Sequence, residues 1–175
     1  IEFDSAQGMN VNKGETRHRG AELALAYDLS ELDPSLDGFS VYGSYAYTQA
    51  KRRSGDFTGN DLTLYSRHTG TFGGRYQKAD WTFNLDGYAQ SQQYADDGNT
   101  REESTDGTTG IIPGFANWDL RAARKLALSG QEMELGFGVK NIFDRRYFTR
   151  ASIENNGGIY AGAPRTFFAE FTTTF

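Results

Sequence analysis

A small set of arginine, amide and tyrosine side chains in this sequence could hold an anionic, partly aromatic ligand. Arginine binds carboxylate and phosphate oxygens through paired, charge-assisted hydrogen bonds, and it also stacks on flat rings. Amide and phenol groups can add neutral hydrogen bonds. Several of these side chains lie in segments rich in Gly, Asn, Asp, Ser and Thr, which we expect to be loops. The candidate binding residues are Gln90, Gln92, Arg101, Arg150, Asn156 and Tyr160.

The nucleophilic and basic side chains of this sequence do not form a recognisable catalytic motif. The sequence has no Gly-x-Ser-x-Gly elbow, no His-Glu-x-x-His pair and no phosphate-binding glycine loop. His18 and His68 lie far apart, without a Cys or carboxylate beside them, so we expect both to be structural. The sequence therefore predicts no catalytic residue and no metal site. An enzyme that uses one of these histidines remains a minor alternative.

Two charged segments suggest ion-binding sites, but exposure to solvent in loops explains their charges more simply. The basic run 51–53 (KRR) could contact an anionic ligand or lipid phosphates, although such runs usually form the solvated base of a loop. The acidic pairs at 96–97 and 102–103 lack the spacing of an EF-hand. We interpret both segments as solvated loops.

Composition narrows the class of protein. The 175 residues are 37% apolar and contain no run near the roughly 20 apolar residues that a membrane-spanning helix needs. Aromatic residues make up 14% of the chain, and there are 21 glycines and no Cys. Aromatic residues favour strands, and a net charge of −5 argues against a nucleic-acid partner. A β-barrel remains possible, because its strands alternate between lipid-facing and lumen-facing residues.

Apolar and polar residues alternate with a period of two almost throughout, which predicts strands. Leu23, Leu25 and Tyr27 share one face, and Glu22 and Asp28 lie on the other. The strands are long enough to cross a bilayer at a tilt, and their polar faces carry the charges expected of a wet lumen. We predict strands over residues 1–6, 16–29, 39–52, 66–77, 81–95, 115–126, 132–143 and 165–175.

The links between these strands alternate between short and long. The links over 30–38, 78–80 and 127–131 are short, whereas those over 7–15, 53–65, 96–114 and 144–164 are mostly longer and polar. Outer-membrane barrels have short periplasmic turns and longer extracellular loops, so this alternation predicts an all-β, antiparallel transmembrane barrel. The last strand would then place Phe175 at the periplasmic rim. The chain also opens in what reads as the middle of a strand, which indicates part of a larger barrel.

Several motifs resemble TonB-dependent outer-membrane receptors. Residues 138–148 (GVKNIFDRRYF) resemble the family's penultimate strand, and residues 162–168 (GAPRTFF) resemble the start of its final strand. Residues 16–23 (TRHRGAEL) and 64–69 (LYSRHT) resemble earlier family strands, and a terminal Phe is typical of such barrels. The stretch from Tyr147 to Gly162 is most similar to receptors for ferric siderophores and ferric citrate.

This resemblance implies a fold, partners and a location. Residues 1–175 would form about eight C-terminal strands of a barrel of about 22 strands. The N-terminal plug domain, the segment that engages TonB and the other strands would lie outside this chain. The implied function is TonB-energised uptake of a ferric chelate, either a siderophore or ferric citrate, across the outer membrane of a Gram-negative bacterium. Iron would be cargo rather than a cofactor, and the protein would contact outer-membrane lipid and lipopolysaccharide. The main alternative is a complete eight-stranded barrel with a structural or adhesive role.

Overall fold

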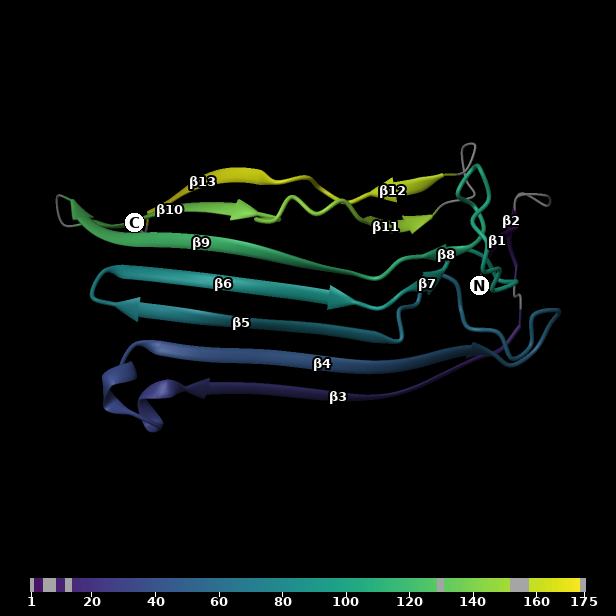
Figure 1. Ribbon diagram of the computed structural model, residues 1–175, viewed down its shortest axis with the longest axis horizontal. Helices are drawn as coiled ribbons and strands as arrows, with labels where there is room; N and C mark the ends of the chain where they lie inside the picture. The colour runs from purple at the N-terminus through teal and green to yellow at the C-terminus, as the bar shows by residue number, and fades with distance from the viewer. Residues whose placement is uncertain (1, 5–8, 12–13, 129–130, 152–157, 174–175) are drawn as a thin grey trace.

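The computed structural model describes residues 2–4, 9–11, 14–128, 131–151 and 158–173. Seven long strands form one antiparallel sheet in the order β13-β10-β9-β6-β5-β4-β3 (Figure 1). Each strand therefore pairs with its neighbours in chain order, as the sequence predicts. The strands of this sheet are β3 (Thr16–Asp28), β4 (Phe39–Arg52), β5 (His68–Lys78), β6 (Trp81–Gln90), β9 (Phe115–Leu128), β10 (Gln131–Lys140) and β13 (Thr166–Thr173).

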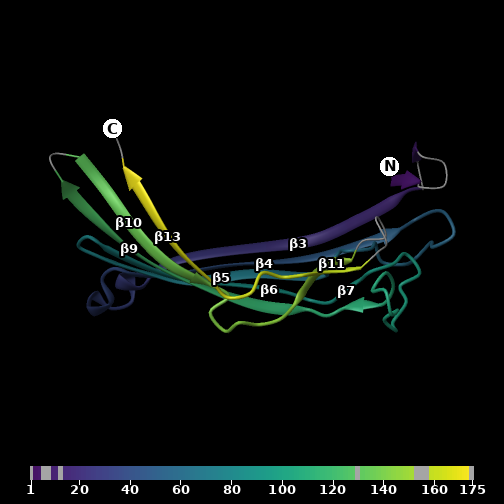
Figure 2. The same cartoon turned by 90° about the horizontal axis from the view of Figure 1, so that it is seen from above.

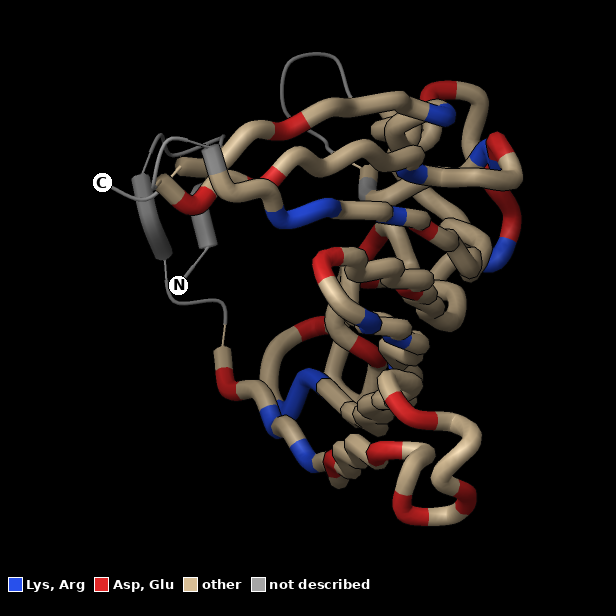
Figure 3. The backbone as a smooth tube through the Cα atoms, turned by 90° about the vertical axis from the view of Figure 1, so that its left-hand side faces the viewer, with Lys and Arg blue, Asp and Glu red and all other residues tan. Residues whose placement is uncertain are grey.

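The sheet bends into an open arc rather than a closed barrel (Figures 2 and 3). Strands β3 and β13 lie at opposite edges and do not pair with each other. The described strands therefore do not form the complete small barrel that was the main alternative. Unpaired edge groups inside a bilayer cost several kcal/mol each, so in a membrane both edges need further strands.

Short turns and long loops gather at opposite ends of the sheet (Figure 1). At the turn end, two single-turn helices, η1 (Leu29–Glu31) and η2 (Pro34–Leu36), join β3 to β4. Asp28 and Asp33 cap these helices by accepting hydrogen bonds from the backbone amides of Ser30 and Ser35. A tight turn through Ala79, which has a φ of 51°, joins β5 to β6. This arrangement confirms the alternation of links predicted from the sequence.

Short hairpins lie at the loop end. The predicted barrel strand over residues 1–6 is instead β1 (Glu2–Asp4), which pairs with β2 (Met9–Val11) outside the large sheet. The predicted strand over 81–95 is shorter than expected: β6 stops at Gln90, and β7 (Gln93–Tyr94) pairs separately with β8 (Ile111–Ile112). Strands β11 (Phe148–Ala151) and β12 (Ile159–Ala161) form the third hairpin.

The register of the large sheet places apolar residues on one face across all seven strands. For example, Leu23 lies opposite Tyr45 in the β3–β4 pair, Phe83 opposite Ala122 in the β6–β9 pair, and Phe137 opposite Ala169 in the β10–β13 pair. We call this the apolar face and the other the polar face. The apolar face carries Leu23, Leu25, Tyr27, Val41, Tyr45, Tyr47, Phe72, Tyr76, Phe83, Leu85, Trp118, Leu120, Leu135, Phe137, Val139, Phe167 and Phe171. The polar face carries Glu22, Ser44, Thr71, Asn84, Asp86, Asn117, Asp119, Arg121, Glu134, Lys140 and Glu170.

The apolar face is uncovered. Leu23 is 70% exposed, Phe137 61% and Phe167 74%. An apolar surface of this extent is unfavourable in water and marks a face that contacts lipid or another protein. Trp81 and Tyr27 lie at the turn end of this face. Phe175, which the sequence predicts at the periplasmic rim, lies outside the described residues. No helix in the part of the chain that the structure describes is long and apolar enough to cross a membrane.

Candidate functional site

The polar face holds an ion-pair network on three neighbouring strands. Arg121 on β9 lies between Glu134 on β10 and Glu170 on β13. Its Nη2 atom lies 2.7 Å from Glu134 Oε1, and its Nε atom donates to Glu170 Oε1 at 2.6 Å. Gly136 makes this possible, because a Cβ there would lie 2.5 Å from Cγ of Glu170. The Glu170 side chain can therefore cross β10 to reach Arg121.

A pocket of about 380 Å³ lies along the polar face between the middle of the sheet and the loop end. Tyr42 donates a short hydrogen bond to Asp86 two strands away, across Gly73, where a Cβ would meet the Tyr42 ring. The rings of Phe115 and Tyr147 stack with centroids 4.1 Å apart. The lining residues are Tyr42, Thr71, Phe72, Asp86, Gly87, Tyr88, Phe115, Asn117, Asp119, Tyr147 and Thr149.

This pocket offers a mixture of aromatic and polar groups suited to a polar ligand. The Nδ2 atom of Asn117 lies 3.5 Å from the hydroxyl of Tyr147, at the limit of a hydrogen bond. Among the described residues, the Oδ1 atom of Asn117 is buried and has no hydrogen-bond partner. A buried acceptor of this kind calls for a water molecule or a ligand group. The pocket can therefore take a hydrogen-bond donor at this atom.

Two long loops, over residues 53–67 and 91–114, meet at Asp97 at the loop end of the sheet. Arg52, 5% exposed at the end of β4, lies with its Nη2 atom 2.7 Å from Asp97 Oδ2. Thr63 and Asn60 from the same loop as Arg53 donate to the side chain and the carbonyl oxygen of Asp97 at 2.7 and 2.9 Å. The interpretation of both charged segments as solvated loops is therefore wrong for Arg52 and Asp97, which neutralise each other. Glu102 and Glu103 are exposed, as expected of a solvated segment.

The third loop joins the cluster through β11 and β12. Gln93, 5% exposed, donates from Nε2 to the carbonyl oxygen of Thr149 on β11 at 2.7 Å. A Cβ on Gly107 would lie 2.3 Å from Ile159 on β12, so the two loops are in close contact. The three long loops therefore form one packed layer at the loop end of the sheet, which we call the loop layer.

The family-like motif at residues 138–148 has a structural role. Asn141, 1% exposed and with a φ of 52°, ends β10. Its Nδ2 atom donates to the carbonyl oxygens of Arg145 and Ala163 at 2.9 and 3.0 Å, and its own backbone amide donates to Asp119. The backbone amide of Arg165 donates to Asp144 at 2.9 Å. The motif thus fixes the chain between β10 and β13, and its Tyr147 also lines the pocket on the polar face.

The predicted binding residues occupy different parts of this layer. Gln90 is half-buried at the outer end of β6 and accepts a hydrogen bond from the Tyr88 hydroxyl at 2.9 Å, directly beside the pocket. Gln92 and Arg101 are exposed on the loop between β6 and β9. Arg150 and Tyr160 are cross-strand partners in the hairpin of β11 and β12. Asn156 lies outside the described residues.

Sequence reasoning missed several pocket residues. Asp86 alternates with apolar neighbours, which indicates its face of the sheet but not its hydrogen-bond partner Tyr42. Tyr42, Asn117 and Tyr147 come together only because β4, β9 and the link after β10 meet in space. No local pattern in the sequence signals that meeting.

Both histidines contact aromatic rings. His68 Nδ1 lies 2.6 Å from the Tyr45 hydroxyl, and the His18 ring packs edge-on against Tyr65 at 5.3 Å. Within the described ranges, no group of three potential metal ligands comes together. The contacts fit the structural role expected of these residues.

An antiparallel meander with one apolar face, one polar face and loops at a single end defines the wall of a large β-barrel. The chain belongs to the TonB dependent receptor-like β-barrel family, whose model matches residues 2–142. This is an outer-membrane family of transport receptors, and the structure is one segment of its barrel.

Solved structures and curated relatives agree with this assignment. The chain is similar to the ferric citrate transporter FecA in its unliganded form, with a TM-score of 0.86 and 48% identity over 91% of this chain. It also resembles BauA, the ferric preacinetobactin receptor from Acinetobacter baumannii, with a TM-score of 0.69 and 19% identity over 93% of this chain. The metal-pseudopaline receptor CntO of Pseudomonas aeruginosa is 29% identical over 98% of this chain.

The chain is short beside these proteins. It covers 24% of the FecA chain, 23% of the BauA chain and 22% of CntO. It thus spans about a quarter of the length of the relatives it matches, and it corresponds to one part of their barrels.

Proposed function

We propose that this chain forms the C-terminal barrel segment of an outer-membrane receptor that takes up an anionic ferric chelate, with ferric citrate as the first candidate. The observation that carries the proposal is the 48% identity to the ferric citrate transporter FecA over 91% of the chain. That alignment extends over most of the strands and loops of the segment. The 19% identity to the ferric preacinetobactin receptor BauA supports only the shared fold.

The loop layer and the pocket below it support a binding role. Arg101 and Arg150 are carried by two different outer loops, where they can bind carboxylate oxygens of a chelate. Gln90 stands between that layer and the pocket, and the Asn117 Oδ1 atom lies deeper on the same wall. The proposed path of the ligand runs from the loops along the polar face, and it requires no bond to be made or broken in the chelate. We therefore propose a transporter rather than an enzyme.

The rest of the receptor completes this function. We propose that a plug domain and a TonB-binding segment, carried by the parent receptor outside residues 1–175, close the lumen and couple release to TonB. The apolar face would then contact outer-membrane lipid, and the polar face would line the lumen. We propose that the loop layer lies on the extracellular side, because outer-membrane barrels have short periplasmic turns and longer extracellular loops.

A second cargo has support from one relative. CntO, a metal-pseudopaline receptor, is 29% identical over 98% of this chain. A metal bound by a pseudopaline-like chelator is therefore the second candidate. The two cargoes must be separated by experiment.

The test is equilibrium binding to the complete receptor in detergent, with ferric citrate, a ferric siderophore and metal-pseudopaline as ligands. We expect ferric citrate to bind most tightly, and Arg150→Ala and Gln90→Ala to weaken binding by about tenfold each, as expected for a lost charge-assisted or buried hydrogen bond. Arg124→Gln, at the opposite end of the apolar face, is the matched control and should leave affinity unchanged. Preference for metal-pseudopaline would favour the second cargo, and binding of none of the three would contradict the proposed function.

A further inference from the structure

The charged residues of the apolar face all have the same sign. Within the described part of the seven strands, this face carries Arg17, Arg19 and Lys51 at the loop end, Lys78 and Arg124 at the turn end, and no carboxylate. The polar face, in contrast, mixes both signs, as in Glu134 and Arg121. The cations therefore lie at the two ends of the apolar face, which are the positions that lipid headgroups would occupy if this face contacts a bilayer.

The cations at the loop end are arranged as an anion site. Arg17 lies directly opposite Lys51, and Arg19 lies two residues further along the same face of β3. Like charges directly opposite each other on a sheet destabilise it unless a counterion lies between them. Lys51 has partners of its own: its Nζ atom donates to the carbonyl oxygen of Gly59 at 3.0 Å and lies 3.9 Å from Asp61 Oδ1. Asp61 compensates the three cations only in part, because its Oδ2 atom binds Arg67 at 2.5 Å.

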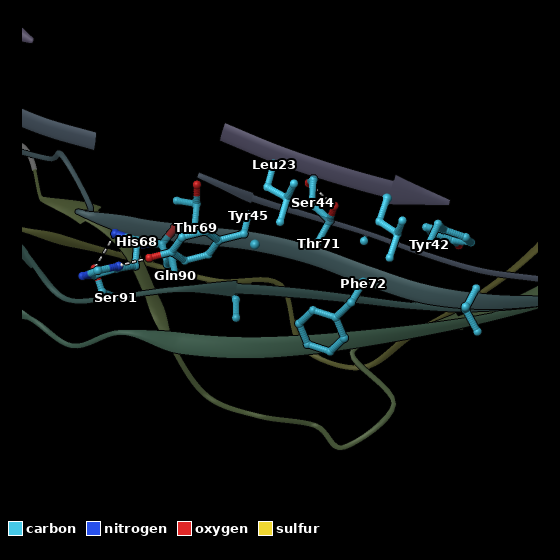
Figure 4. Close-up of a pocket in the computed structure, with 15 residues that line it drawn as sticks. Leu23, Tyr42, Ser44, Tyr45, His68, Thr69, Thr71, Phe72, Gln90 and Ser91 are labelled. Atoms are coloured by element: carbon cyan, nitrogen blue, oxygen red, sulfur yellow. Dashed lines mark hydrogen bonds between the residues drawn. The ribbon is translucent and has the colours of Figure 1, made fainter. Parts of the chain in front are cut away.

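An apolar groove of about 570 Å³ lies further along the same face, nearer the middle of the sheet (Figure 4). Its floor is bare backbone and small side chains at Gly43, Gly70 and Ala89. Leu23 and Phe72 lie along the groove, and Tyr45 meets His68 near one end. Leu23 is four residues from Arg19 on the same strand, so cation and groove are about 13 Å apart, within the span of a single lipid molecule.

The turn end of the apolar face has cations in a different setting. The guanidinium of Arg124 lies over the Trp81 ring at 5.4 Å, a pairing that leaves the cation stabilised by its own neighbour. Lys78 is exposed beside it. Lys78 and Arg124 therefore serve as an internal comparison for the three cations at the loop end.

We propose that Arg17, Arg19 and Lys51 together with the groove bind one phosphate-bearing lipid of the outer leaflet, with its phosphate on the cations and an acyl chain in the groove. Arginine and lysine both bind phosphate oxygens, and basic clusters at a membrane surface select anionic headgroups. The apolar groove accounts for the chain. This inference rests on the proposed location of the receptor in the outer membrane, and it is independent of the cargo.

The experiment is native mass spectrometry of the delipidated complete receptor, titrated with bisphosphorylated lipid A. Arg17→Gln combined with Arg19→Gln removes the headgroup site, and Ala89→Leu fills the groove with an apolar side chain. Lys78→Gln combined with Arg124→Gln is the matched control. Heat-modifiable gel mobility reports folding of each variant, and ferric citrate binding in the same samples reports the proposed function separately.

We expect the headgroup variant to lose about tenfold or more in lipid affinity, because two basic contacts to the phosphate are removed. Ala89→Leu should also weaken binding, dephosphorylated lipid A should bind poorly, and the control pair should match the wild type. Equal loss in the control pair, or no loss in the headgroup variant, overturns the proposal. Full competition by inorganic phosphate with no effect of Ala89→Leu also overturns it, because that result describes a simple anion site.

Discussion

The side-chain amide of Asn141 donates a hydrogen bond to the carbonyl oxygen of Ala163 at 3.0 Å, joining two points 22 residues apart. The same Nδ2 atom donates to the carbonyl oxygen of Arg145, and Oδ1 accepts from the amide of Arg145 at 2.9 Å. Because Asn141 is 1% exposed, water cannot satisfy its side-chain amide, and these three hydrogen bonds do so instead. One side chain therefore holds both ends of the outer segment that leads from β10 to β13.

Asn141→Gly should lower the free energy of unfolding by about 2–4 kcal/mol, since it removes three buried hydrogen bonds. Glycine tolerates the φ of 52°, so this variant isolates the side-chain contribution from backbone strain. The measurement is the urea midpoint of the complete receptor in detergent. Asn141→Ala should be less stable still, because it adds strain at a positive φ. A midpoint for Asn141→Gly equal to that of the wild type would show that these bonds contribute little.

Arg121→Met should destabilise the wall by about 1–2 kcal/mol, because Glu134 and Glu170 then face each other without the shared cation. The figure is modest because all three side chains are partly exposed. Adding Glu134→Gln and Glu170→Gln to the same variant should restore most of the loss. Unfolding midpoints at low and high salt provide the measurement. No recovery in the triple variant would mean that Arg121 acts through packing rather than charge.

Arg52→Met should loosen the loop layer by about 2–3 kcal/mol, because it leaves Asp97 without its ion-pair partner at a site with little solvent. Hydrogen exchange at the amide of Leu64, which donates to the carbonyl oxygen of Tyr94 at 2.9 Å, reports this local opening. Arg53→Met is the control, since Arg53 is the exposed neighbour in the same run. Equal exchange rates in the two variants would contradict a structural role for Arg52.

Asp106 should remain ionised in strongly acidic solution. The side chains of Ser104 and Thr108 and the backbone amide of Thr108 bind its carboxylate, which lowers its pKa from 3.8 to about 2. A depressed pKa stabilises the turn at pH values above 3.8, and this contribution disappears as the pH falls through about 2. Carboxyl chemical shifts in selectively labelled receptor would follow the titration. Ser104→Ala should raise the pKa toward 3.8, while Ser54→Ala should not change it.

Much of the fold could be predicted from the sequence because the register is regular. No bulge interrupts the pairing of the seven strands, so the parity of Leu23, Phe83 and Phe137 correctly gives the face of each strand. The prediction was wrong for residues 1–6, which pair locally with β2, and for the end of β6. Short segments of this kind carry too little periodicity to separate a barrel strand from a hairpin.

The candidate site could be predicted only in outline. Gln90 and the Arg150–Tyr160 hairpin do lie at the loop end, as the loop lengths indicate. The interlock of Arg52 with Asp97 could not be predicted, because it depends on how two loops meet rather than on either loop alone. The pocket around Asn117 likewise depends on the curvature of the sheet.

The chain-order pairing of the seven strands has a consequence for how the wall is assembled. Each strand after β3 pairs with the strand that immediately precedes it in the large sheet, so each new pairing closes only the link between two consecutive strands. Contacts that are local in sequence form faster than distant ones. The wall can therefore grow hairpin by hairpin, with a growing edge that always exposes a single template strand. A single seam between distant strands is then the one slow step left to complete a barrel.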